Sequence, residues 1–166
     1  MIPVVKQMPD KLIVGRRIAT SSAQYNPFEL WSKFMPKRKE ILNTISPELF
    51  SVQVFQENTF SSTTFNENTL FEMWAAVEVS KIEQIPTELD STIIVGGAFV
   101  TFILKGEQPT LTEHYNYIIN DWLPKEGYRI DNRAHFQVMG DKYKRNDPNS
   151  EEEVWIPIAE IGEANI

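Results

Sequence analysis

Hydrophobic and polar residues alternate along several short stretches of the chain, which is the pattern of β-strands with one buried face. Such stretches lie at residues 11–19, 50–55, 71–79, 92–105, 136–139 and 151–158. Two of them combine an aliphatic face with a face that carries a carboxylate and an indole. These paired residues are Glu72 with Trp74, and Glu153 with Trp155. Side chains two positions apart in a strand point the same way, so each pair can reach a common neighbour.

A first amphipathic helix is predicted after the strand at 11–19. Asn26 suits the N-cap and Pro27 the first helical position. The spacing of the apolar residues favours one buried face, made of Phe28, Trp31, Phe34 and Met35. Pro36 should kink or end this helix, although the pattern also permits a continuation to Ile45.

A second helix is predicted after the long strand at 92–105, which a Gly96-Gly97 bend interrupts. Thr110 and Glu113 form a capping box at its start. Its apolar face should comprise Leu111, Tyr115, Ile118, Ile119 and Trp122. Pro124 is expected to stop it.

The resulting order is strand, helix, strand, strand, and then the same again. The capping pairs are offset by 84 positions (113 − 29) and the paired tryptophans by 81 (155 − 74). These echoes predict an internal duplication, with pseudo-repeats at about 4–82 and 90–160 in a single domain spanning 1–166. The expected fold class is α+β, in which the duplicated halves share an antiparallel sheet with their helices on one side.

Composition narrows the function classes. The chain has 166 residues, 42% of them hydrophobic, which suits one packed domain. Its net charge of −7, without a basic stripe, argues against direct nucleic-acid binding. Cysteine is absent and only two histidines are present, so neither a metal nor another cofactor is expected. A signal peptide and a membrane-spanning stretch are both lacking, which predicts a cytoplasmic protein without membrane contact.

The face of Glu153 and Trp155 is the main chemical candidate. A carboxylate beside an indole suits an apolar cation, because the carboxylate neutralises its charge and the ring attracts it. On residues 151–158 alone, a solvated strand end with a tryptophan packed at the rim explains the pattern equally well. His114 is expected to be a solvated helix residue, and His135 offers no base or metal role.

Several segments resemble a known family. They are residues 96–106, residues 121–128 with their Trp-Leu-Pro and Gly-Tyr steps, residues 136–139, residues 153–158, and residues 74–79. Together they resemble the GyrI-like effector-binding domain (also described as a SOUL-type fold), the ligand-binding module of some AraC- and MerR-type bacterial transcription regulators. The chain departs from the family pattern where Phe99 replaces a tyrosine, Ala76 a glycine, Gln137 a carboxylate and Met139 an aromatic residue.

The resemblance implies a groove between the two halves that binds hydrophobic, often cationic, small molecules in the manner of multidrug-binding domains. The candidate ligand-binding residues are Glu153, Trp155, Trp74, Phe99, Thr101, Gln137, Met139 and Tyr128. Because Gln137 is uncharged, the groove should hold a single negative charge, that of Glu153, and should prefer monocationic or neutral aromatic ligands over dications.

Three functions remain open from the sequence. The first is a free-standing cytosolic protein that senses or sequesters such ligands. The second, implied by hydrolytic members of the family, is a hydrolase of strained hydrophobic compounds with Glu153 as general base. The third is an inhibitor-type module that contacts a protein partner.

Overall fold

The structure is a computed structural model that describes residues 2–56, 59, 66–106, 111–144 and 147–162. Most of the polar stretch 56–68 and the predicted cap residue Thr110 lie outside these residues. None of the described helices has the length and apolar character needed to cross a bilayer.

Nine strands and two helical segments make up the described chain. The strands are β1 (Val4–Met8), β2 (Lys11–Thr20), β3 (Leu49–Val54), β4 (Phe71–Val79), β5 (Asp90–Ile94), β6 (Gly97–Lys105), β7 (Tyr128–Ile130), β8 (His135–Met139) and β9 (Glu151–Glu160). The first helical segment is α1 (Pro27–Phe34) followed by the 3-10 turn η1 (Met35–Glu40). The second is α2 (Leu111–Tyr117), the π turn η2 (Ile118–Trp122) and α3 (Leu123–Glu126).

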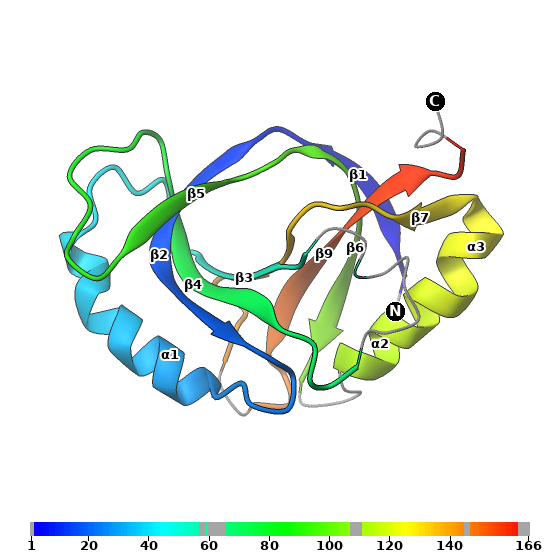
Figure 1. Cartoon of the computed structure of the whole chain (residues 1–166), viewed down its shortest axis with the longest axis horizontal. Coiled ribbons are helices and arrows are strands. Elements are labelled where there is room, and N and C mark those ends of the chain that lie inside the picture. The colour runs from blue at the N-terminus through cyan, green and yellow to red at the C-terminus, as the bar shows by residue number, and fades with distance from the viewer. Residues whose placement is uncertain (1, 57–58, 60–65, 107–110, 145–146, 163–166) are drawn as a thin grey trace.

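The strands form one antiparallel sheet in the order β1-β6-β9-β8-β3-β4-β2-β5, with β7 paired to β9 (Figure 1). This order is symmetric about its centre. From one end it reads β1, β6, β9, β8, and from the other end the corresponding strands are β5, β2, β4, β3. The opening strands are exchanged: β1 pairs with β6 of the second half, and β5 pairs with β2 of the first. The α+β fold class is confirmed. The origin of the two halves by duplication, and their limits at 4–82 and 90–160, stay a proposal.

Both helical segments cover the same face of the sheet. The register places Ala75, Ser51, Gln137 and Val154 on one face, because residues directly opposite each other in a ladder share a face. Helix α1 buries Leu30 and Phe34 near Ala75 on that face. Toward the other end of the sheet, Ile118 and Leu123 of the second helical segment pack with Val154 on the same face. We call this the helix-covered face and the opposite one the helix-free face.

The helix-free face is nevertheless buried at its centre. Its core contains Phe50, Trp74, Phe99 and Phe136, together with Met8 and Ile94 at the ends of the exchanged strands. The β1–β2 and β5–β6 connections arch across the same end of the sheet (Figure 1). They meet where the Gly96 amide donates to the Asp10 carboxylate at 2.7 Å. A Cβ at Gly96 would collide with the backbone of Met8 and Pro9, so the crossing requires glycine here.

The observed strands differ from the predicted ones in two respects. The single strand expected at 92–105 is two strands, β5 and β6, which pair at opposite ends of the sheet. The strands β1 and β7 were not expected, because residues 4–8 (Val-Val-Lys-Gln-Met) do not alternate between apolar and polar, and Tyr128–Ile130 has only three residues. The strands expected at 11–19, 50–55, 71–79, 136–139 and 151–158 are confirmed to within one or two residues.

The helix limits also differ from expectation. Asn26 caps α1 as predicted, its side chain accepting from the Glu29 amide at 3.3 Å. The buried face is Leu30 and Phe34, whereas Phe28 is 63% exposed, and the predicted continuation to Ile45 is wrong because Ile41 is already extended. The second helix does not stop at Pro124. The π turn η2 widens the helix just before this proline, which accommodates a residue that has no amide donor, and the helix ends at Gly127.

Candidate ligand-binding site

An aromatic cluster occupies the helix-free face across its central strands. It consists of Phe50, Trp74, Phe99, Phe136 and Trp155. The ring of Phe136 stacks on Trp155, with centroids 5.3 Å apart and planes inclined by 11°. Phe99 meets both rings edge-on, at 5.6 Å from Phe136 and 5.7 Å from Trp155. Three predicted site residues, from β4, β6 and β9, therefore share one face, as strand parity predicts.

Each tryptophan of the cluster donates to the carboxylate two residues before it. The Trp74 indole nitrogen lies 2.6 Å from Glu72 Oε1, and the Trp155 indole nitrogen lies 3.4 Å from Glu153 Oε1. In each of the two predicted pairs, the carboxylate and the indole are therefore in direct contact. These contacts also orient each carboxylate along the edge of an aromatic ring.

A cation of the chain lies over each indole. The Arg17 guanidinium is 5.9 Å from the Trp74 ring, and the Lys6 ammonium is 5.5 Å from the Trp155 ring. Arg17 also forms ion pairs of 3.1 Å with Glu72 and with Asp90. Trp74 is only 2% exposed, whereas Trp155 is half-buried. The Trp74 ring is thus enclosed, whereas the Trp155 ring is accessible from solvent.

A hollow of about 370 Å³ lies beside Glu153. Two of its lining residues, Ile103 and Val138, flank Glu153 directly in the sheet register. Its other lining residues are Glu48, Gly140, Asp141, Lys142, Glu151 and Glu152. Burial raises the pKa of the Glu152 carboxyl above its usual value. The expectation of a single negative charge does not hold for this hollow, because five carboxylates and one lysine line it.

The predicted site residues do not all share the helix-free face. Thr101 lies directly opposite Trp155 on that face, where its hydroxyl donates to the Val4 carbonyl at 3.2 Å. Gln137 lies on the helix-covered face, because the register pairs Phe136, and not Gln137, with Trp155. It is buried there and exchanges two hydrogen bonds with Gln53. Tyr128 stacks on Trp122 beside the second helical segment, at 6.1 Å.

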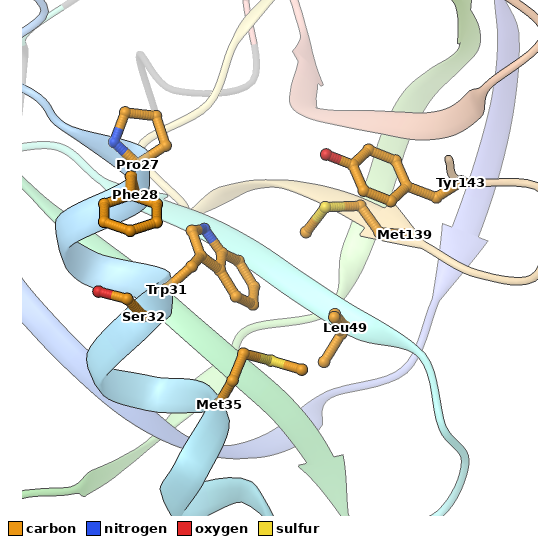
Figure 2. A pocket seen from close by; sticks show the side chains of 8 residues that line it. All are labelled: Pro27, Phe28, Trp31, Ser32, Met35, Leu49, Met139 and Tyr143. Carbon is orange, nitrogen blue, oxygen red and sulfur yellow. The ribbon is translucent and has the colours of Figure 1, made fainter. Parts of the chain in front are cut away.

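Met139 lines a different hollow, also of about 370 Å³, outside the helix-free face. Figure 2 shows its side chain next to Tyr143, across from Trp31 and Met35 of the first helical segment. Leu49, Pro27, Phe28 and Ser32 complete the lining. Met139 lies on the helix-covered face with Gln137, because residues two positions apart in a strand point the same way. It is therefore separated from Glu153 and Trp155, which lie on the helix-free face.

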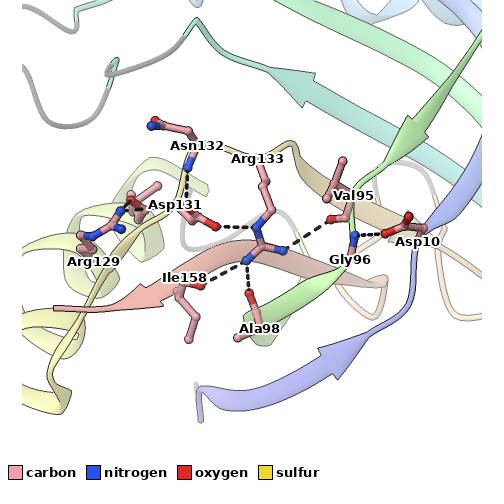
Figure 3. Close-up of polar contacts among 10 residues, drawn as sticks. Asp10, Val95, Gly96, Ala98, Arg129, Asp131, Asn132, Arg133 and Ile158 are labelled. Atoms are coloured by element: carbon pink, nitrogen blue, oxygen red, sulfur yellow. Dashed lines mark hydrogen bonds and ion pairs between the residues drawn. The ribbon is translucent and has the colours of Figure 1, made fainter. Parts of the chain in front are cut away.

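Arg133 supports the cluster and was not singled out by the sequence. Its guanidinium lies 4.6 Å from the ring centroid of Phe99. It donates to the carbonyls of Ala98 at 2.6 Å and Ile158 at 3.1 Å, and it pairs with Asp131 at 2.6 Å (Figure 3). Lys6, Arg17 and Phe136 were missed as well. Alternation along residues 136–139 was enough to assign Phe136 to a face of the strand. The positions of Lys6 and Arg17 over the indoles depend on which strands pair, which the sequence does not reveal.

These observations define an α+β domain with an aromatic, acidic face between two similar halves. The chain belongs to the GyrI-like small molecule binding domain family, which matches residues 1–159. Its sequence is 22% identical over 155 residues to the transcriptional regulator BrlR of Pseudomonas aeruginosa, covering 93% of this chain and 54% of BrlR. The chain thus spans about half the length of this curated relative.

Two solved structures share the fold. The C-terminal domain of EcmrR superposes with a TM-score of 0.69 at 16% identity, covering 96% of this chain and 98% of that one. SAV2435, solved bound to tetraphenylphosphonium, gives a TM-score of 0.67 at 12% identity, covering 96% and 94%. At these identities the likeness establishes the fold, and the family match makes the chain a small-molecule-binding domain.

Proposed function

We propose that the chain binds a bulky, hydrophobic organic cation on the helix-free face, between Trp155 and the hollow beside Glu153. The observation that carries this proposal is the position of Glu153. Its carboxylate borders the acidic hollow and also accepts from the indole of a half-buried tryptophan. A cation seated there meets a negative charge and an aromatic ring at once.

The charge of the surroundings favours a cation over an anion. Five carboxylates and one lysine line the hollow, and the whole chain carries a net charge of −7. Lys105 and Lys142 each lie 3.8 Å from Glu151, so they neutralise that carboxylate and leave Glu153 without a lysine at pairing distance among the described residues. The binding of tetraphenylphosphonium by SAV2435 makes this ligand the first probe to use.

Isothermal titration calorimetry with tetraphenylphosphonium tests the proposal. We expect one ion to bind per chain, and Glu153→Gln to weaken binding by about 1–3 kcal/mol, because the Coulomb attraction between the carboxylate and the phosphonium charge near the protein surface is lost. Trp155→Leu should also weaken binding because the aromatic contact is lost. The exposed Glu126 of α3 provides the matched control, since Glu126→Gln removes the same charge on the other face. Equal affinities for wild type, Glu153→Gln and Trp155→Leu would contradict the proposal.

The finer sequence-based predictions belong with this proposal. We propose that the 166 residues bind the ligand by themselves, in the cytoplasm, and do not bind DNA directly. A mobility-shift assay at low salt checks the last point, and a specific complex would overturn it. Incubating the protein with strained or ester-bearing hydrophobic compounds and analysing them by mass spectrometry checks the hydrolase alternative, which requires product that disappears with Glu153→Gln. A pull-down that yields a stable protein partner, without any ligand-induced thermal shift, would favour the interaction-module alternative.

A further inference from the structure

The ammonium group of Lys6 covers the solvent side of the Trp155 ring. Lys6 lies on β1 directly opposite Phe99 of β6, so its side chain points to the helix-free face. Its Nζ atom is 5.5 Å from the indole centroid. In the sheet, β8 with Phe136 flanks β9 on one side, and β6 with β1 flanks it on the other. Phe136 and Lys6 therefore approach the indole from opposite sides.

The other half shows what a fixed cation looks like in this fold. Arg17 lies over Trp74 from the directly opposite position on the adjacent strand β2, and two carboxylates, Glu72 and Asp90, hold its guanidinium at 3.1 Å. Lys6 is exposed on an edge strand, and it has no carboxylate partner among the described residues. The register places Lys6 opposite Phe99 at one end of the sheet and Asp90 opposite Gly15 at the other, so a lysine stands at one end in the position that a carboxylate takes at the other.

We propose that Lys6 is an internal competitor that occupies the cation-binding face of Trp155 in the ligand-free protein and determines which charged ligands bind. The proposal rests on the proposed function of the Glu153–Trp155 site. A ligand cation reaches the indole only after the ammonium moves into solvent, and it then remains close to a like charge. An anionic ligand of the same shape gains attraction from Lys6, which opposes the repulsion from Glu153.

The expected size of the effect follows from the two contributions of Lys6. Its contact with the indole must be given up, and at an exposed site such a contact is weak. Repulsion between two charges a few ångströms apart near the surface adds to it. Removing the ammonium should therefore tighten cation binding roughly three- to tenfold.

Tetraphenylphosphonium and tetraphenylborate, which share a shape and differ in charge sign, provide the test. Both are titrated into wild type, Lys6→Met and the control Lys125→Met, which removes an exposed lysine from α3. We expect Lys6→Met to tighten phosphonium binding and weaken borate binding, and Lys125→Met to change neither by more than about twofold. Thermal unfolding of each variant verifies that it is folded. Unchanged phosphonium affinity in Lys6→Met, with binding that still depends on Glu153, overturns the role of Lys6 and leaves the proposed function intact.

A measurement without ligand separates the two proposals further. A lysine side chain above an indole face has its ε-methylene proton resonances shifted upfield by the ring current. We expect this shift for Lys6 and not for Lys125, and we expect it to disappear in Trp155→Leu and on saturation with phosphonium. An unshifted Lys6 resonance in the free protein overturns the inference even when the ligand binds. Failure of every variant to bind phosphonium overturns the proposed function, and the role of Lys6 in selectivity with it.

Discussion

The imidazole of His135 shows how strongly a single residue depends on its surroundings in this fold. It is 1% exposed on the helix-covered face, where the Tyr115 hydroxyl lies 3.1 Å from Nδ1 and the Phe55 ring meets it edge-on at 4.9 Å. Burial, with a smaller contribution from the positive charge of Arg133, lowers the pKa of His135 from 6.5 to about 3. Burial likewise raises the pKa of the Tyr115 hydroxyl. Both groups are therefore neutral at pH 7.

The pKa of His135 predicts a loss of stability in mild acid. The unfolded chain binds the proton at about pH 6.5 and the folded chain only near pH 3, so stability present above pH 6.5 is lost as the pH falls through this window. Between pH 7 and pH 5 we expect the free energy of unfolding to drop by about 2 kcal/mol because of this residue. Urea unfolding at both pH values measures it. His135→Gln should remove this part of the drop, whereas His114→Gln should remove only the smaller part that follows from its own pKa, which burial also lowers. Equal drops in all three proteins would contradict the assignment.

At the scale of one residue, strand parity correctly predicted which neighbours on a single strand share a face. Glu153 and Trp155 lie two positions apart on β9, so alternation alone gave them a common face. Gln137 and Met139 also share a face, but which face could not be known before the register of β8 against β9. The cations over the two indoles come from strands more than 50 residues away in sequence, and only the pairing of strands brings them there.

At the scale of elements, local signals located the starts of helices better than their ends. Asn26 and Pro27 marked the start of α1, because a cap requires particular side chains at particular positions. Pro124 was misleading, because the π turn before it lets the helix continue. Tertiary pairing likewise decided that residues 92–105 form two strands, because Gly96 lies at a crossing of two connections that no local pattern reveals.

The end of the second helical segment depends on Gly127. This residue has a φ of +83° and its amide bonds to the carbonyls of Leu123 and Pro124. Nothing lies within 4 Å of a Cβ placed there, so substitution costs only the backbone strain. Gly127→Ala should lower the free energy of unfolding by about 1–2 kcal/mol, whereas the neighbouring Glu126→Ala should change it by less than about 0.5 kcal/mol. Equal stabilities of the two variants in urea titrations would show that alanine is not strained at position 127.

At the scale of the whole molecule, a buried pair of glutamines is among the polar contacts that join the two halves. Gln53 of β3 and Gln137 of β8 are buried on the helix-covered face at the centre of the sheet. Their amides exchange hydrogen bonds of 2.9 and 3.2 Å. The two positions are 84 apart, the same offset as the predicted helix caps, so each residue is the counterpart of the other. The sequence contained this offset, but the contact follows only from the pairing of β3 with β8.

A double-mutant cycle tests how much this pair contributes. Gln53→Leu alone leaves the Gln137 amide buried without its partner, and should cost about 1–3 kcal/mol of stability. Gln137→Leu should cost a similar amount for the same reason. The double variant should cost less than the sum of the two, with a coupling of about 0.5–3 kcal/mol measured by urea unfolding. Gln7→Leu on the exposed edge strand is the control, and strictly additive effects would mean that the pair does not couple the halves.

The exchange of opening strands has a consequence for protein engineering. Residues 81–88 connect the halves and are mostly exposed, so a break there disturbs little packing. Each fragment would nevertheless keep one strand whose partner lies in the other: β1 requires β6, and β5 requires β2. The two fragments are therefore expected to complement each other when mixed, and neither should complete its sheet alone. Since Glu48 of the hollow would arrive on one fragment and Glu153 on the other, such a split protein is expected to act as a reporter whose reassembly responds to a ligand bound in the hollow.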